Sequence, residues 1–433
     1  MEVPRLRTTS WIREKRNKTN GFLSQQKKFT RLITQNYDEE VDEAREVTKE
    51  EAPHSKVKNV PSLYKISEEL ARYGHFGAVH RCVEISSKKT FMAKIVKVKG
   101  ADRELVAREI ETLNIARHKN LLYLHESFDS LEEYVLIYEF ISGMDIFERL
   151  GTNFDLTEQE IVRYMRQVCQ ALKFLHGLNY AHFDIRPENI VYATRKSSTI
   201  KIIEMGQARL LTPGENLRIQ FTAPEYCAPE VHNSDFVTTA TDMWSVGVLA
   251  YVLLSGLNPF AAESTQKMIE HISNAEYVFD SEAFREISIE GMDFVDRLLI
   301  KERKHRMTAS EALEHPWLRT KIENISSKVI KTLRHRRYYQ SLAKKEWSAS
   351  ISAARSTVQE TSFSSSSMAE MKFETMSMSS MSSITSESVY AMSSSSQSHV
   401  EGSTIRAALH SGQGESVKSV KYFALLILAF IKY

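Results

Sequence analysis

The sequence predicts an α+β protein in which a small strand-rich lobe is followed by a larger helical lobe. From residue 78 onward, AVHRCVE and FMAKIVKV alternate apolar and polar residues, as paired strands do. Beyond Asp145 the apolar residues recur three and four apart, which is the period of a helix. The change of period near Asp145 therefore separates the two lobes.

In each lobe, the sequence predicts the position of one helix from its apolar stripe. The stretch DRELVAREIETLNIA carries a single apolar stripe, formed by Val106, Ile110 and Leu113. In the second lobe, Thr157 and Glu160 have the spacing of a capping box, in which each side chain accepts a backbone hydrogen bond from the other residue. The helix that they begin carries a longer stripe, formed by Ile161, Met165, Val168, Leu172 and Leu175.

Composition bounds the class of protein. With 42% hydrophobic residues in 433, the chain can bury a large core, and we expect a soluble, cytoplasmic protein. A net charge of +2 gives no attraction to nucleic acid or to anionic membrane. The cysteines Cys82, Cys169 and Cys227 lie far apart, which argues against a disulfide framework and fits a reducing compartment.

Four segments are expected along the chain. Residues 1–60 form a charged linker, because nine Lys/Arg face two Glu in residues 1–33 and eight Asp/Glu face two Lys/Arg in residues 38–51. The two lobes occupy residues 64–318, and residues 321–347 form a basic amphipathic tail. Residues 348–433 are Ser-rich and end in a short apolar run, shorter than the roughly 20 residues that cross a membrane. No secretory signal and no membrane anchor are expected.

The first chemical motif lies in the strand-rich lobe. In YGHFGAV, Gly74 and Gly77 would let backbone N–H groups approach phosphates, although such a turn is more often a plain hairpin. Lys94 follows on the next strand, and Glu109 on the helix could hold its ammonium group near a phosphate pair. A single lysine on a strand usually faces solvent, so a functional role for Lys94 depends on the motifs that follow.

The second motif lies in the helical lobe. In HFDIRPENIVY, Asp184 could orient a hydroxyl nucleophile, and Asn189 could bind a divalent ion. Fifteen residues after Asn189, Glu204 offers a carboxylate in EMG. Later positions complete the ordered series, namely Ala228-Pro229-Glu230, Asp242 in TATDMWSVG, and Arg306.

This ordered series resembles the eukaryotic protein-kinase domain. Over residues 64–347 the sequence is similar to the titin-like and myosin-light-chain-kinase-like Ser/Thr kinases. The stretches that carry this similarity are KKTFMAKIVKVKG, NIARHKN, EFISGMDIFER, STIKIIEMGQAR and ERKHRMTASEALEHPWL. The resemblance implies the bilobal kinase fold, ATP with Mg²⁺ or Mn²⁺ as cofactors, a protein substrate, and a place in the muscle sarcomere.

The resemblance also implies roles for particular residues. It makes Asp184 and Arg186 catalytic and Asn189 and Glu204 metal ligands. The implied nucleotide site comprises Gly74, Gly77, Val79, Ala93, Lys94, Glu109, Glu139 and Ile141.

Several positions depart from the family pattern. Glu204 stands where the family has Asp, and its extra methylene moves the carboxylate by roughly 1.5 Å. Mg²⁺ requires oxygens at about 2.0–2.1 Å, so we expect weakened Mg-ATP binding. Phe183 replaces the Arg that pairs with a phosphorylated activation segment, Arg186 replaces a Lys, and Arg72 occupies the first Gly position of the loop. Together these changes favour weak or absent catalysis.

The tail VIKTLRHRRYYQSLAKKEW is predicted to be a regulatory helix. Its apolar side would hold Val329, Leu333, Tyr338 and Leu342, and its cationic side includes Arg336. That spacing suits a helix bound in a groove, as in targets of a calmodulin-like protein, or an ordinary surface helix with a solvated basic face. The resemblance implies that this segment covers the active cleft and inhibits it.

A second inhibitory element is implied just before Ala228. The family pattern has two tyrosines there, one of which blocks the catalytic Asp, whereas this chain has Tyr226 and Cys227. The sequence leaves open which of the two positions carries the block.

Two functions therefore remain open. The first is an autoinhibited Ser/Thr protein kinase of low activity. The second is a pseudokinase scaffold in muscle mechanosensing, which binds signalling and protein-turnover partners.

Overall fold

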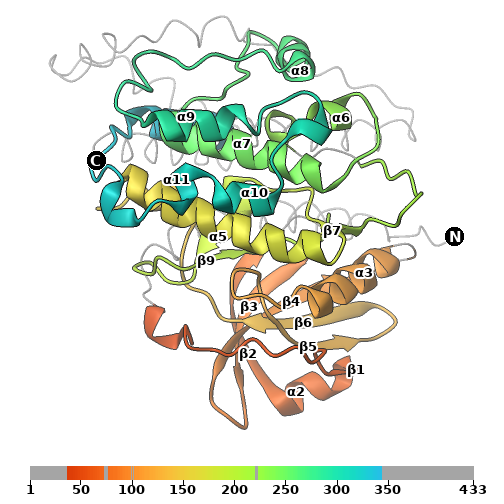
Figure 1. The fold of residues 1–433 in the computed structure, drawn as a ribbon. Coiled ribbons are helices and arrows are strands. Elements are labelled where there is room, and N and C mark those ends of the chain that lie inside the picture. Colours follow the sequence, from red (N-terminus) through yellow and green to blue (C-terminus); the bar gives the residue numbers. More distant parts are fainter. Residues whose placement is uncertain (1–36, 73–76, 99, 101, 220–222, 344–433) are drawn as a thin grey trace, which may run out of the picture. The chain divides into compact units, whose positions relative to one another are not determined.

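The computed structural model describes residues 37–72, 77–98, 100, 102–219 and 223–343. It confirms the predicted bilobal α+β architecture, with a six-stranded sheet and one long helix followed by a lobe of helices (Figure 1). The predictions for the basic N-terminal block, the Ser-rich tail and the apolar C-terminal run concern residues outside these ranges.

The sheet of the first lobe has the strand order β1-β5-β6-β4-β3-β2. Neighbouring strands are antiparallel except for β1 and β5, which are parallel. The strands are β1 (His54–Lys56), β2 (Tyr64–Arg72), β3 (Ala78–Glu84), β4 (Thr90–Lys97), β5 (Leu124–Asp129) and β6 (Glu133–Glu139). The helical elements of this lobe are η1 (Asp38–Glu40), η2 (Val57–Asn59), α2 (Val60–Leu63) and α3 (Asp102–Ile115).

Alternation along β4 decides which side chains face the second lobe. Phe91 and Ala93 enter a small cluster on the outer face of the sheet. Met92 and Val96 enter the main core, which continues into the helical lobe. Because side chains alternate along a strand, Lys94 lies on the same face as Met92 and Val96.

The second lobe is built around α5 and α7. Its helices are α4 (Ile146–Arg149), α5 (Glu158–Gly177), α6 (Pro229–His232), α7 (Thr239–Ser255), α8 (Thr265–Asn274), α9 (Ile289–Asp296), α10 (Ala309–Glu314) and α11 (Pro316–Arg319). Its short 3₁₀ segments are η3 (Pro187–Asn189), η4 (Pro224–Tyr226), η5 (Arg303–His305) and η6 (Ile322–Asn324). Its strands are β7 (Tyr180–Ala181), β8 (Ile190–Tyr192), β9 (Ile200–Ile202) and β10 (Arg209–Leu210).

The predicted stripe of α5 is buried, but its capping box is only half formed. All five predicted stripe residues belong to the core. Thr157 accepts a hydrogen bond from the N–H of Glu160 at 3.2 Å, as predicted. The carboxylate of Glu160 instead forms an ion pair with Arg163, three residues along the helix. It therefore does not accept the hydrogen bond from the N–H of Thr157 that a complete capping box requires.

The acidic block before the first lobe is not the solvated linker that its charge suggested. Asp38 accepts hydrogen bonds from the Ser142 hydroxyl at 2.6 Å and from the N–H of Arg195 at 3.2 Å. Glu40 forms an ion pair with Arg81 at 2.7 Å. Farther along, β1 adds a parallel strand to β5. The acids meet specific partners in both lobes, and composition alone cannot reveal such partners.

Among the described helices, none combines the length and the apolar content needed to cross a membrane.

Candidate active site

Lys94 and Glu109 meet between β4 and α3. The Lys94 ammonium lies 2.8 Å from the Glu109 carboxylate, which also accepts a hydrogen bond from the Tyr138 hydroxyl at 3.2 Å. Burial lowers the pKa of Lys94, but the carboxylates of Glu109 and Glu204 raise it by more, so the net pKa lies above its ordinary value. A fixed cation therefore faces the second lobe, as the sequence predicted. No sequence pattern indicated this role for Tyr138.

The glycine turn is described only in part, because Gly74 lies outside the described residues. Gly77 has φ +107°, and a Cβ there would lie 2.2 Å from the carbonyl oxygen of Ile95. Only glycine fits this close approach to β4 without strain. In the adjacent pairing, Val79 lies opposite Lys94, and Ala93 is fully buried beside it. Val79 and Lys94 thus share the face that is turned toward the second lobe. The side chain of Ala93, which was also predicted to contact a nucleotide, instead enters the cluster on the opposite face of the sheet.

The link between the lobes contains Glu139 and Ile141. The Glu139 carboxylate forms a buried ion pair with Lys201 at 2.8 Å and accepts the N–H of Tyr123 at 2.9 Å. Because these partners occupy the side chain, Glu139 can offer a ligand only its backbone. Ile141 is partly buried against the main core.

The predicted catalytic loop brings Asp184, Arg186 and Asn189 together. The Asn189 side-chain amide donates to the Asp184 carboxylate at 2.7 Å and to its backbone carbonyl at 2.9 Å. The Arg186 guanidinium lies 3.5 Å from the same carboxylate. Since the amide nitrogen of Asn189 is used in these bonds, its carbonyl oxygen is the atom that it can offer to a cation.

Asp242 is a positioning residue for this loop, a role that its sequence motif did not indicate. Its buried carboxylate accepts the backbone N–H groups of His182 at 2.8 Å and Phe183 at 2.7 Å, and it contacts His176 at 2.9 Å. Phe183 has φ +63°, a conformation that costs of order 1–3 kcal/mol for a non-glycine residue. Asp242 holds the strained peptide in place, next to Asp184.

Glu204 follows β9 and lies close to the other charged groups of the site. Burial raises the pKa of Glu204, Lys94 lowers it, and Glu109 and Asp184 raise it again, so the net pKa lies above its ordinary value. A divalent cation beside Glu204 would offset the repulsion between these carboxylates.

The residues of the site fit a hard divalent cation. Among the described residues, no group of three or more His, Cys, Asp or Glu side chains forms a ready metal cage. An ion carried by a nucleotide needs fewer protein ligands, because phosphates and waters supply the remaining oxygens. The oxygen donors of Asn189 and Glu204 suit Mg²⁺ or Mn²⁺ in that setting.

Tyr226 lies at the end of η4 and contacts the tail. Its hydroxyl is 2.9 Å from the Tyr338 hydroxyl, and its carbonyl oxygen accepts a hydrogen bond from Ser245 at 2.8 Å. Tyr338 also packs against Phe147 of α4, with ring centroids 5.6 Å apart. The tail thus rests on the surface formed by α4 and η4.

The predicted inward face of the tail is wrong in part. Val329 pairs with Thr157 as an extended bridge, outside any helix, and is 50% exposed. A helix occupies residues 333–343, and Leu333 at its start is 60% exposed. The extended pairing delays the start of the helix, so the phase assumed from Val329 does not apply.

The inward face of this helix begins at His335, which no sequence pattern had indicated. His335 is 0% exposed, and its Nε2 lies 2.8 Å from the carbonyl oxygen of Leu253. Tyr338 and Leu342, both partly buried, follow at three and seven residues. Arg336 is exposed but donates to the carbonyl oxygen of Leu150 at 3.1 Å. A histidine between two arginines is typical of an exposed basic face, so the sequence did not indicate that His335 is buried.

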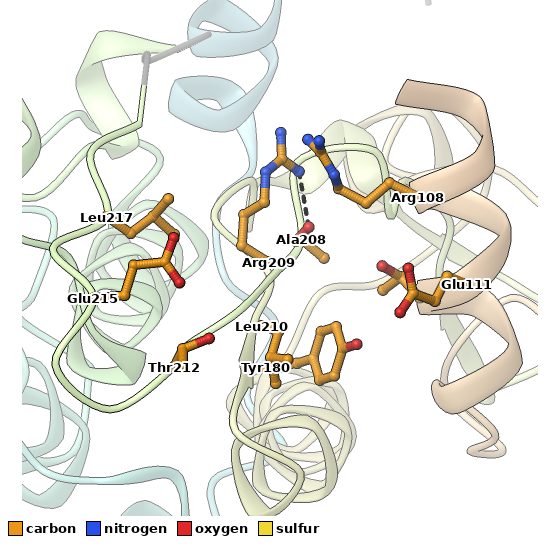
Figure 2. Close-up of a pocket in the computed structure, with 10 residues that line it drawn as sticks. Arg108, Glu111, Tyr180, Ala208, Arg209, Leu210, Thr212, Glu215 and Leu217 are labelled. Carbon is orange, nitrogen blue, oxygen red and sulfur yellow. Dashed lines mark hydrogen bonds between the residues drawn. The ribbon is translucent and has the colours of Figure 1, made fainter. Parts of the chain in front are cut away.

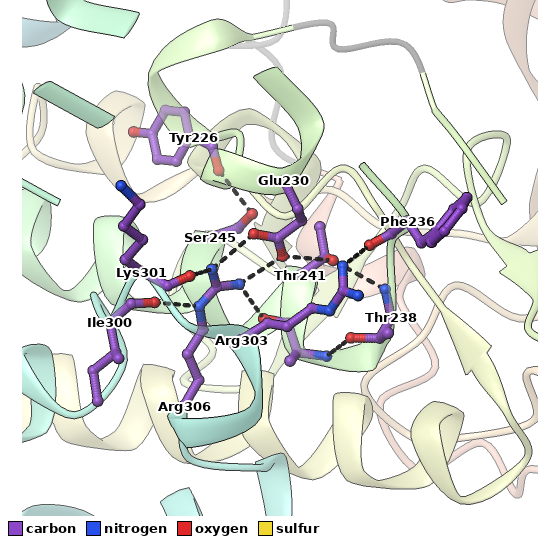
Figure 3. A network of polar contacts seen from close by, with 11 residues as sticks. Tyr226, Glu230, Phe236, Thr238, Thr241, Ser245, Ile300, Lys301, Arg303 and Arg306 are labelled. Carbon is purple, nitrogen blue, oxygen red and sulfur yellow. Dashed lines mark hydrogen bonds and ion pairs between the residues drawn. The ribbon is translucent and has the colours of Figure 1, made fainter. Parts of the chain in front are cut away.

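A buried ion pair fixes the segment that follows Tyr226. Arg306 holds both carboxylate oxygens of Glu230, at 2.6 and 2.7 Å (Figure 3). The same guanidinium donates to the carbonyl oxygens of Ile300 at 2.7 Å and Lys301 at 3.0 Å, and Thr241 donates to Glu230 at 2.9 Å. The network joins the start of α6 to α7 and η5.

Comparisons with known proteins agree with this geometry. Residues 64–318 match the family described as protein kinase domain. Human myosin light chain kinase family member 4 is 42% identical over 262 residues, which cover 60% of this chain and 68% of that protein.

Two solved structures are similar at the level of the whole domain. The structure of titin kinase and its flanking domains is 68% identical with a TM-score of 0.70, covering 73% of this chain and 57% of that one. The autoinhibited serine kinase domain of the giant muscle protein titin is 69% identical with a TM-score of 0.65, covering 66% of this chain and 89% of that one.

Proposed function

The chain belongs to the protein kinase family, and on that premise we propose that it is a titin-like Ser/Thr protein kinase of low activity, autoinhibited by its tail. The contact that carries the proposal is the Lys94–Glu109 ion pair at 2.8 Å, because it presents a fixed cation to nucleotide phosphates. Asp184 would orient the hydroxyl of a protein substrate, and Arg186 would face the transferred group. A location in the cytoplasm, at the sarcomere, is part of the same proposal.

The nucleotide would lie between the sheet and the catalytic loop. Val79 and Ile141 would contact its base, and the backbone near Gly77 would face its phosphates. Asn189 and Glu204 would hold Mg²⁺ or Mn²⁺, which when bound neutralises charge on the phosphates. The protein's own part is to align the hydroxyl and to keep Lys94 and Asp184 in place.

The longer arm of Glu204 gives the test of this function. In the full chain, Glu204→Asp is expected to raise the affinity for Mg-ATP about tenfold, or about 1.4 kcal/mol, because it restores the shorter reach that octahedral Mg²⁺ favours. The gain with Mn-ATP should be smaller. Calorimetric titration of both metal nucleotides measures this, with Glu290→Asp, at an exposed position of α9, as the matched control.

Two outcomes would count against the proposal. Equal Mg-ATP affinity in Glu204→Asp and the native chain would show that arm length does not limit binding. Absence of binding with either metal in the native chain, with recovery in Glu204→Asp, would favour the scaffold function described below.

The tail supports autoinhibition by its position. Tyr338 contacts Tyr226 of η4 and Phe147 of α4, and on this proposal the tail helix would occupy surface that a substrate peptide needs. Gly256, at the end of α7, permits this docking. It has φ +71°, and a Cβ there would lie 2.5 Å from the backbone nitrogen of His335.

Gly256→Ala is therefore expected to release the tail helix. We expect a loss of about 3 kcal/mol in the free energy of unfolding, from backbone strain and the contact with His335 together. Gly214→Ala is the matched control, since Gly214 has φ +85° but nothing within 4 Å of an added Cβ. Its loss should be about 1 kcal/mol. Hydrogen exchange of residues 333–343 should accelerate only in Gly256→Ala, and equal exchange in both variants would refute the docking role of Gly256.

The second candidate function is a pseudokinase scaffold. It is favoured by Glu204 and Phe183, which depart from the family pattern, and by the outer side of the tail helix, where Leu333 is 60% exposed. That side could bind signalling or protein-turnover partners, or a calmodulin-like protein. If Lys94→Met binds such partners as well as the native chain does, the result fits the scaffold function. If Lys94→Met loses phosphoryl transfer, the result fits the kinase function.

A further inference from the structure

A buried histidine joins the tail helix to the end of α7, and the proposed phosphoryl transfer makes no use of it. His335 is 0% exposed, and its Nε2 lies 2.8 Å from the carbonyl oxygen of Leu253. A carbonyl oxygen only accepts hydrogen bonds, so Nε2 carries a proton and donates it. The charge of the ring therefore depends on whether Nδ1 also carries a proton.

Nδ1 lies where a second proton would have no acceptor. This nitrogen is buried and, within the residues that the structure describes, makes no hydrogen bond. A Cβ added to Gly256 would lie 2.8 Å from Nδ1, so the nitrogen lies against the Cα of this glycine. A protonated Nδ1 would place an unpaired donor and a full charge in this contact, which costs free energy. The docked position therefore favours the neutral ring.

The charged groups around His335 do not favour an imidazolium either. Residues 252–256, at the end of α7, include no titratable side chain. On the tail, Arg334 forms an ion pair with Glu282 at 2.9 Å, and Arg336 donates to a backbone carbonyl oxygen at 3.1 Å. Of the charged groups that the structure describes, only Arg334 shifts the pKa of His335, and it lowers this pKa because one cation opposes another.

The other titratable side chains at the docked tail do not change their charge in mild acid. The Lys328 ammonium lies 2.6 Å from Glu286, and this contact lowers the pKa of the Glu286 carboxyl below its ordinary value. Burial raises the pKa values of the Tyr226, Tyr251 and Tyr338 hydroxyls above the ordinary one. Among these groups and His335, only a histidine has an ordinary pKa between about 5 and 8.

We propose that protonation of His335 releases the tail helix from the end of α7. The imidazolium has two N–H donors, and both find acceptors only when the ring reaches water. Release would uncover Tyr226 and Phe147, which Tyr338 contacts in the docked tail. It would raise phosphoryl transfer only if the tail inhibits the enzyme, so this consequence, unlike the release itself, rests on the proposed function.

The pKa of the ring agrees with the direction of this effect. Burial lowers the pKa of His335, the hydrogen bond with Leu253 raises it in part, and Arg334 lowers it again, to about 4. In a released tail the pKa returns to about 6.5. Because the docked ring binds a proton less readily, docking is complete above about pH 6.5 and weakens as the pH falls toward about 4.

A second group of titratable side chains lies away from this contact. Figure 2 shows a cavity of about 390 Å³ between α3 and the segment that follows Glu204, with Glu111 and Glu215 on its two sides. The residues that line it include none from the tail helix and none from the end of α7. Ionisation in this cavity therefore does not act on the docked helix directly.

Amide hydrogen exchange of the full chain tests the release without nucleotide or substrate. Each exchange rate is divided by the intrinsic rate at the same pH, which gives a protection factor. Between about pH 7.5 and pH 5.5, the protection of residues 333–343 should fall about tenfold, because the lower pH lies about one unit below the pKa of a released histidine. The protection of α7 should change by less than about twofold over the same range.

The variant His335→Gln removes the titration and keeps a donor at the position of Nε2. Its protection over residues 333–343 should change by less than about twofold between the two pH values. His305→Gln is the matched control, because it changes an exposed histidine of η5. It should keep the tenfold fall of the native chain.

Two results would overturn the proposal. One is constant protection of residues 333–343 in the native chain between the two pH values. The other is a tenfold fall that persists in His335→Gln, since another group would then sense the acid.

A further measurement decides the question if His335→Gln prevents docking at both pH values. The imidazole of His335 is followed in the native chain by NMR of ¹³C-labelled histidine, and its resonance is the one that His335→Gln lacks. The ring should titrate at least about one unit below pH 6.5, and titration at or above this value would overturn the proposal. Because none of these measurements needs ATP, a failure of nucleotide binding or phosphoryl transfer would leave their results unchanged.

Discussion

Asp184→Asn is expected to lower phosphoryl transfer to a protein hydroxyl by about 1,000-fold, within the range that a positioned general base contributes. The amide keeps the size of the carboxylate and can still accept the hydrogen bond that Asn189 donates at 2.7 Å. Folding and nucleotide binding should therefore change little, with the affinity for Mn-ATP staying within about twofold. Transfer of labelled phosphate to a peptide measures the rate, and calorimetric titration measures the binding.

The control for this prediction is Asp155→Asn, which changes an exposed aspartate in the loop before α5. It should transfer phosphate at the native rate. If Asp184→Asn transfers phosphate as fast as the native chain, the observed activity does not come from this site, and the scaffold function gains support.

Local patterns predicted the elements and the central ion pair. The alternation of FMAKIVKV fixes both the strand and the face on which Lys94 lies, since side chains on a strand alternate. The stripe on α5 is equally direct, because period and burial coincide there. These predictions depend on neighbours within a few residues, and such information is present in a single sequence.

Contacts between distant segments were not predictable in this way. The role of Asp242 depends on its reach to the backbone of His182 and Phe183, about sixty residues earlier in the chain. The tail was given the wrong phase because its pairing with Thr157 delays the helix. The acidic block around Asp38 looked solvated because its partner Ser142 lies on the link between the lobes. In each case the deciding partner is supplied by the tertiary fold.

The ion pair between Arg306 and Glu230 should dominate the stability of the helical lobe. Arg306→Met is expected to lower the free energy of unfolding by about 3–5 kcal/mol, because it leaves a buried carboxylate without its cation. Arg306 is 3% exposed and holds both oxygens of Glu230, so water cannot replace it. Urea unfolding of the full chain measures the loss. Arg297→Met, which breaks the exposed pair with Asp293, should cost about 0.5 kcal/mol or less.

The pH dependence separates this explanation from a simple packing defect. Burial raises the pKa of Glu230, but Arg306 lowers it by more, so the folded pKa lies below the ordinary 4.5. For such a group, the stabilisation is present above the unfolded pKa and is lost as pH falls through the folded one. The difference in the free energy of unfolding between the native chain and Arg306→Met should therefore shrink as the pH drops below about 4.5, because a protonated Glu230 needs no cation.

The double variant Glu230→Gln with Arg306→Met should recover part of the loss at pH 7, since it leaves no buried charge. A loss that is independent of pH, and that the double variant does not reduce, would mean that Arg306 acts through its packing over Trp244, 5.0 Å from the ring centre, and not through the charge of Glu230.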